Sequence, residues 1–220
     1  MRNLRIFVMR ALAAAALLGL GLAGSAWAQV NPPVASNVPQ PLQQQPSIWG
    51  GRFEIFAAGS MQFAKATTAN SEALSTTNVG GFQIGALVHG NDSNAFEIRF
   101  SFAQPKQTYG SNLSVKASDY TYSMDYVRTI PAQGSLRPFF LGGVSVIHYE
   151  PTGNNNTPGA GPQIRPGIDF GAGIDWKLGS QLSLRIEFRD ILYRVPDFGL
   201  IGISQWNNMP IPDVGLAWHF

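Results

Sequence analysis

The 220-residue sequence contains no cysteine, few charged residues and no apolar run long enough to cross a bilayer as a helix. The missing cysteine excludes disulfides, thiolate metal sites and attachment of lipid through a cysteine. Charged residues make up 13% of the chain, where soluble proteins carry about 25%, and together with frequent glycine this favours either a secreted β-protein or one that faces lipid in strands. The three histidines are not closely paired, and the sequence therefore predicts no metal site.

The N-terminus has the features of a secretory signal peptide. Three arginines precede an apolar stretch over residues 11–23, and small residues ending at Ala28 form a cleavage site. We therefore expect residues 1–28 to be removed on export, because the alternative, a membrane anchor, needs a longer apolar core. Cleavage leaves 12 Lys and Arg against 13 Asp and Glu, so the mature chain gives no indication of nucleic-acid binding.

The mature chain divides into a leader and a single domain. Residues 29–47 are rich in Pro and Gln and lack any hydrophobic period, which is typical of a flexible, partly polyproline II segment. Residues 48–220 contain eight segments in which apolar residues recur at every second position, the pattern of strands with one apolar face. The clearest is AFEIRFSF, residues 95–102, where apolar side chains alternate with Glu97, Arg99 and a serine.

The connections between these segments alternate between long and short. Residues 60–80 form a long connection and GNDSN, residues 90–94, a short one, as in outer-membrane barrels with short periplasmic turns and longer outer loops. An even number of strands places both termini on the same, periplasmic side. We predict an all-β fold, an eight-stranded antiparallel up-and-down transmembrane β-barrel. A soluble lipocalin-like barrel, with its apolar face inward, is the alternative. The segment RPFFLGGVSVIHY, residues 137–149, is apolar on both faces, and its phase stays open.

The last strand carries a second signal. Apolar side chains alternate along the ending VGLAWHF at Val214, Leu216, Trp218 and Phe220. This ending is similar to the C-terminal signal read by the barrel-assembly machinery, and residues 48–220 resemble the outer-membrane β-barrel proteins of the OmpA/OmpX-like superfamily. The resemblance implies an outer-membrane location, contact with membrane lipid, and the assembly machinery as a partner during biogenesis. For Phe220 it implies a role as an assembly signal as well as a lipid-facing residue.

The polar face of the strands carries eleven charged residues that we expect inside the barrel. An eight-stranded barrel is just wide enough for its own side chains, so these charges must pair. The predicted lumen network comprises Arg52, Glu54, Glu97, Arg99, Asp125, Asp169, Asp175, Arg185, Glu187, Arg189 and Asp213.

A paired network predicts a closed lumen, and hence a structural or surface-interaction role for a monomeric barrel. The outer loops would then meet an extracellular ligand that the sequence does not identify. A narrow ion-conducting pore is the alternative, and a lipid-modifying outer-membrane enzyme or a soluble ligand binder would belong to different classes.

Two further observations bear on function. His148 is the one histidine near the expected outer rim, and its spacing from Ser145 and Glu150 does not match the pattern of lipid A deacylases. We therefore predict no catalytic residues, no cofactor and no enzymatic activity. The connection DFGLIGISQWNNMP, residues 197–210, is unusually apolar for a loop. We interpret it as a continuation of the last two strands beyond the membrane, with an adhesive tip as the alternative.

Overall fold

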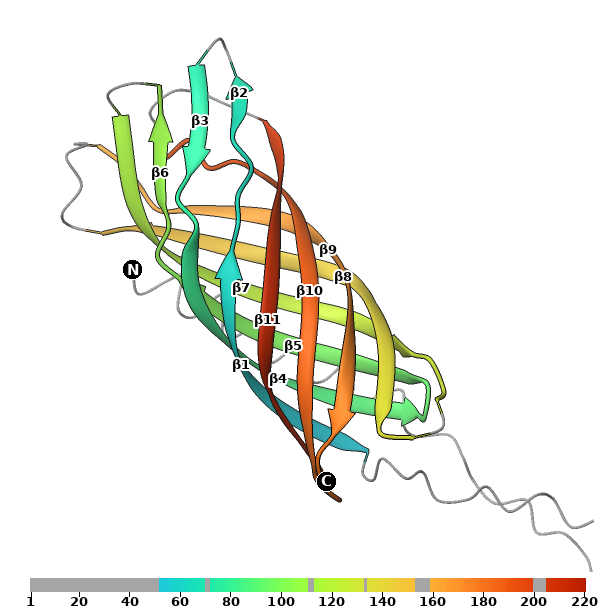
Figure 1. Cartoon of the computed structure of the whole chain (residues 1–220). Helices are drawn as coiled ribbons and strands as arrows, with labels where there is room; N and C mark the ends of the chain where they lie inside the picture. The colour runs from blue at the N-terminus through green and yellow to red at the C-terminus, as the bar shows by residue number, and fades with distance from the viewer. Residues whose placement is uncertain (1–51, 70–71, 111–112, 133, 153–158, 200–204) are drawn as a thin grey trace, which may run out of the picture. The chain divides into compact units, whose positions relative to one another are not determined.

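A computed structural model describes residues 52–69, 72–110, 113–132, 134–152, 159–199 and 205–220 (Figure 1). The expected signal peptide and the Pro/Gln-rich leader lie outside the described residues. In the described part of the chain, no helix has the length and hydrophobicity that a membrane span requires.

Eight long strands form a closed antiparallel barrel (Figure 1). They are β1 (Phe53–Gln62), β4 (Val79–Asn91), β5 (Asn94–Ala103), β7 (Leu113–Thr129), β8 (Leu136–Pro151), β9 (Gln163–Lys177), β10 (Leu182–Arg194) and β11 (Trp206–His219). Each strand pairs with the next, and β11 pairs with β1 from Glu54↔His219 to Ser60↔Asp213. This last pairing closes the ring and removes the free edges of the sheet. The predicted eight-stranded up-and-down barrel is confirmed.

The two ends of the barrel differ. At the end that carries the C-terminus the turns are short, as between β4 and β5, where the Asn91 side chain accepts hydrogen bonds from the Ser93 backbone at 3.0 Å and the Asn94 amide at 2.8 Å. At the opposite end three small strands, β2 (Thr67–Ala69), β3 (Glu72–Thr76) and β6 (Lys106–Tyr109), extend β7 into a second sheet in the order β2-β3-β6-β7 (Figure 1). We call these strands with the adjoining part of β7 the distal sheet. They lie in segments for which the sequence predicted only loops.

The two faces of the wall have opposite character. On β5 the side chains of Phe96 and Ile98 are 63% and 53% exposed, whereas the intervening Glu97 and the next inward residue, Arg99, are buried. The apolar face therefore points outward and the charged face inward. This arrangement contradicts the soluble lipocalin-like alternative, because a barrel in water would expose its charges.

The structure also resolves the phase of β8. Phe140 is exposed, whereas Arg137, Phe139 and Leu141 are buried in the interior. Pairing of Arg137 with Asp175 on β9 sets this register. Both faces of this strand are apolar because one face contacts lipid and the other packs in a small core inside the barrel.

The interior contains an apolar core at the end of the barrel near the distal sheet. Residues from β3, β6, β7, β8, β10, β11 and the connection after β10 form it: Leu74, Tyr109, Val115, Ala117, Ile147, Tyr149, Ile191, Tyr193, Val195, Phe198, Met209 and Ile211. Phe198 is buried with a backbone φ of 51°, and its ring packs edge-on against Tyr109 and Tyr149. Two apolar residues of the 197–210 connection, Phe198 and Met209, therefore belong to the core, while residues 200–204 lie outside the described part of the chain.

Candidate functional site: the charged barrel interior

Five charged side chains on two strands form the centre of the interior. Glu97 and Arg99 occupy successive inward positions on β5, and Arg185, Glu187 and Arg189 do so on β10. Because β5 and β10 are four places apart in a ring of eight strands, they face each other across the lumen. Each of these side chains is at most 1% exposed. The period of two along a strand is thus what aligns both charged rows toward one another.

Ion pairs join these two strands across the lumen. Arg99 Nη1 lies 2.8 Å from Glu187 Oε1, and Arg185 Nη2 lies 3.0 Å from Glu97 Oε2. Arg189 Nη2 adds a third link, 3.1 Å from Glu97 Oε1. Pairs also form along each strand, with Arg99 Nη2 2.6 Å from Glu97 Oε1. Each glutamate therefore contacts three guanidinium groups, which offsets the large cost of burying its charge.

A second group of contacts surrounds Glu54, near the C-terminal end of the barrel. Its carboxylate lies 3.0 Å from Arg185 Nη1, 3.2 Å from His219 Nδ1 and 3.3 Å from His89 Nε2. Arg137 Nη2 lies 3.5 Å from the same carboxylate and 3.2 Å from that of Asp175. This group continues the network from the centre of the barrel to its end.

A third group lies toward the distal sheet. Arg189 contacts Asp125 at 2.8 Å and Asp169 at 3.1 Å, and Arg99 contacts Asp213 at 3.3 Å. The wall also packs aromatic rings beneath the cations. The Arg185 guanidinium carbon lies 4.2 Å from the ring centroid of Phe139 and 5.0 Å from that of Phe56, distances at which cation–π attraction operates.

The structure places ten of the eleven predicted network residues inside the barrel. The prediction for Arg52 is wrong: this residue precedes β1 and its side chain is exposed. Extrapolating the alternation backward beyond the first paired residue caused the error. Arg137, which the sequence left unassigned because the phase of β8 was open, occupies the interior instead.

Sequence reasoning missed three more interior groups. His89 and His219 lie near the ends of β4 and β11, strands that pair with β1 on either side, and both rings contact the Glu54 carboxylate. The Gln83 side chain donates to Asp213 at 3.1 Å and accepts from Arg99 at 2.8 Å. A neutral amide among alternating small residues offers little signal in a sequence.

The four residues of the predicted assembly signal all point outward. Val214, Leu216, Trp218 and Phe220 are between 37% and 58% exposed. The backbone N–H of Phe220 donates to the carbonyl of Phe53 at 2.8 Å, so the end of the chain is held against the start of β1. This bond explains in physical terms why the alternation continues to the last residue. Recognition by the assembly machinery stays a prediction.

The serine and histidine considered for catalysis do not converge. Ser145 is buried and points into the barrel, whereas His148, three residues further along β8, points outward and lies near Tyr120, with the two rings tilted and their centroids 6.1 Å apart. Among the residues that the structure describes, no group of three or more His, Asp or Glu side chains has the arrangement of a metal site.

The connection after β10 is tied to β9 by Asp197 and to β6 of the distal sheet by Tyr109. Partial burial opposes ionisation of Asp197, but hydrogen bonds from the Gln163 side chain and the Gly199 backbone, with the charge of Arg165, outweigh it and lower the pKa of Asp197. Burial raises the pKa of Tyr109, whose hydroxyl donates to the carbonyl of Pro196.

An outward apolar belt, a closed ring of eight strands and an inward charged network define an integral outer-membrane β-barrel. The comparison with protein families agrees. Residues 13–220 match the model of the outer membrane protein beta-barrel domain, and the chain belongs to this family.

Several solved structures share the fold at low sequence identity. Neisserial surface protein A has a TM-score of 0.58 and 11% identity, with 77% of this chain and 98% of that chain covered. Ail of Yersinia pestis, in complex with the heparin analogue sucrose octasulfate, has a TM-score of 0.51 and 10% identity, covering 78% and 99%. The outer membrane protein AlkL, whose structure was determined in lipid bilayers, has a TM-score of 0.51 and 12% identity, with 85% of this chain and 97% of that chain covered. A comparison with curated protein sequences found no match.

Proposed function

We propose that this protein is a closed, monomeric outer-membrane barrel with a structural or surface-interaction role, and that its charged network blocks the lumen. One observation carries the proposal: the ion pairs of Arg99, Arg185 and Arg189 with Glu97 and Glu187 link opposite walls, and none of these side chains is more than 1% exposed. A conducting path needs water along the lumen, and this layer leaves no accessible surface for it.

We further propose that both termini face the periplasm. The short turns lie at the end that carries Phe220, and the distal sheet lies at the other (Figure 1). Barrels of this membrane have short periplasmic turns and longer extracellular loops. The distal sheet would then stand outside the cell.

The distal sheet is the part best suited to meet an extracellular partner. It extends past the barrel on β7, which at 17 residues is longer than the 9 to 11 or so needed to cross a bilayer. Tyr109 of the distal sheet packs against Phe198 in the apolar core, and this contact fixes the sheet and the loops that it carries to the barrel. The identity of the partner is left open. That Ail, a barrel of similar fold, was solved with an anionic heparin analogue is compatible with such a surface role.

We propose no catalytic function. The support is geometric: Ser145 and His148 lie on opposite faces of β8, so a nucleophile and its base do not meet there. Expression of the protein should leave the mass of lipid A unchanged, and a mass change abolished by His148→Ala would overturn this part of the proposal.

A narrow pore is the second candidate, and the composition of the network favours one property for it. The buried arginines Arg99, Arg137, Arg185 and Arg189 face the seven carboxylates of the predicted network, all of which are buried. If the network opened, the excess of negative charge would make the path selective for cations.

Conductance in planar bilayers distinguishes the two candidates. We expect the purified protein to show no discrete channels, and Arg185→Ala to introduce conductance because it removes contacts to Glu54, Glu97 and Glu187 together. Glu150→Ala, a change at an exposed position on β8, is the matched control and should stay silent. Discrete cation-selective channels from the unaltered protein would reject the closed lumen and favour the pore.

A further inference from the structure

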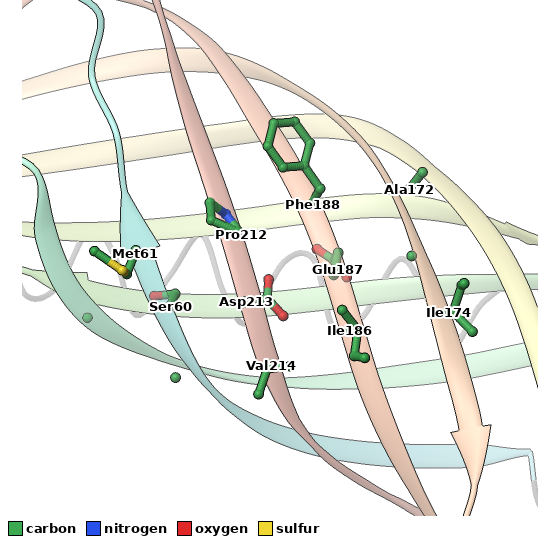
Figure 2. A pocket seen from close by; sticks show the side chains of 13 residues that line it. Ser60, Met61, Ala172, Ile174, Ile186, Glu187, Phe188, Pro212, Asp213 and Val214 are labelled. Atoms are coloured by element: carbon green, nitrogen blue, oxygen red, sulfur yellow. The ribbon is translucent and has the colours of Figure 1, made fainter.

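The lipid-facing side of the barrel contains a shallow pocket over β9, β10, β11, the end of β1 and Gly81 of β4 (Figure 2). Met61, Ile174, Ile186, Phe188 and Val214 form its outward-pointing walls, and each is between 43% and 54% exposed. The pocket thus opens toward the acyl chains of the membrane.

The pattern of side-chain sizes explains the pocket. Phe188 stands on the outer face between two small residues in register with it, Pro212 on β11 and Ala172 on β9. On the next row, Val214 pairs with Gly59 of β1, which has no side chain. A large ring flanked by small neighbours leaves furrows on an otherwise convex wall, and an acyl chain has the width to fill them.

Polar groups follow the pocket along the same two strands, toward the distal sheet. Asp190 Oδ2 accepts a hydrogen bond from the Asn208 amide at 2.9 Å, and both side chains lie on the outward face. Asp190 Oδ1 is buried and has no hydrogen-bond partner among the described residues. A carboxylate in this position suits a lipid that offers hydroxyl or amide N–H donors below its headgroup.

Beyond this pair, a cation lies at the level expected for headgroups. Arg194 is paired in register with Trp206, and its guanidinium carbon lies 5.3 Å from the ring centroid. Arg194 is six residues from Phe188, about 20 Å along the strand and about 15 Å along the membrane normal at a tilt near 40°. With Phe188 placed at the middle of an apolar band about 25 Å tall, this height is roughly half of the band and puts Arg194 and Trp206 at the boundary of the bilayer.

We infer that this face of β10 and β11 is a specific site for one acylated, phosphorylated glycolipid of the outer leaflet. An acyl chain occupies the pocket beside Phe188, a sugar hydroxyl or amide meets Asp190, and a phosphate pairs with Arg194. A glycerophospholipid lacks the donors in its ester linkages. The inference rests on the proposed orientation, in which Arg194 faces the outer leaflet.

The test measures lipid retained by the full chain. The protein is extracted from outer membranes in mild detergent and the bound lipopolysaccharide is counted per barrel by native mass spectrometry. Ala172→Phe fills a furrow and Arg194→Gln removes the cation. Two changes are matched controls: Ala86→Phe, on the outer face of β4, and Arg128→Gln, at the end of β7 away from the distal sheet.

We expect about one glycolipid per unaltered barrel, and a loss of about tenfold in Ala172→Phe and in Arg194→Gln, with the controls unchanged. Gel mobility before and after boiling shows whether each variant is folded. Equal retention by all folded variants would overturn the site and leave the closed lumen intact, because these residues lie outside it. Retention of a glycerophospholipid instead, sensitive to Arg194→Gln, would overturn both the glycolipid and the proposed orientation.

Discussion

Replacing Glu187 by leucine tests whether the interior network stabilises the barrel. Glu187 Oε1 lies 2.8 Å from Arg99 Nη1 and 3.3 Å from Arg189 Nε, and Oε2 lies 3.3 Å from Arg185 Nε. The variant leaves three guanidinium groups, each at most 1% exposed, without this common partner. Leucine is close in size, so the change removes charge with little loss of volume.

The expected cost follows from the burial. Removing one member of a buried ion pair costs about 3–5 kcal/mol, because the remaining charge stays desolvated. In this variant Arg99 and Arg185 still contact Glu97, so we expect a loss of stability of about 3 kcal/mol, the lower end of this range. Adding Arg99→Met to Glu187→Leu removes one of the unpaired cations, and we expect the double variant to recover about 1 kcal/mol.

The free energy of unfolding is measured by urea titration of the barrel in lipid vesicles, followed by tryptophan fluorescence, with equal slopes required for the comparison. Glu150→Leu, at an exposed position, controls for the chemical change and should alter stability by no more than about 0.5 kcal/mol. A cost below about 1 kcal/mol for Glu187→Leu would refute the reasoning, since it would mean that these arginines are hydrated.

Further predictions concern the wall, the distal sheet and the chain end. Gly143→Val should cost about 1–3 kcal/mol or prevent folding, seen as a lower temperature of the gel-mobility shift, because a Cβ at this position would clash with the Met124 carbonyl oxygen. Since the pKa of Asp197 is lowered, its contribution is present above its unfolded pKa of about 3.9 and lost as the pH falls below it. Proteolysis of the connection after β10, which Asp197 holds against β9, should therefore increase in acid, and less steeply in Asp197→Asn. The raised pKa of Tyr109 predicts a second loss at alkaline pH. The distal sheet should lose its protection from proteolysis as the pH rises above about 10, and Tyr109→Phe should shift this alkaline loss. Deletion of Phe220 should abolish the heat-dependent mobility shift of the membrane fraction; an unchanged shift would exclude an assembly role.

The barrel strands were largely readable in advance because a wall with lipid on one side and a packed lumen on the other imposes a period of two. The segment predicted at residues 95–102 corresponds to β5, Asn94–Ala103. The small strands β2, β3 and β6 were not predicted, because three to five residues are too few to establish a period. Their pairing with one another and with β7 brings together parts of the chain that local composition marks as loops.

The lumen shows the same division. Alternation alone assigns Glu97, Arg99, Glu187 and most of their neighbours to one face, and the narrow width of an eight-stranded barrel requires that face to be paired. Which charges meet depends on register and on closure of the ring: β5 lies opposite β10, and Arg137 lies in the interior while Arg52 does not. Ion pairs form over a few ångströms between strands far apart in the chain. Periodicity along the chain therefore determines which side chains share a face, and only the closed barrel determines which face lies inside and what its side chains touch.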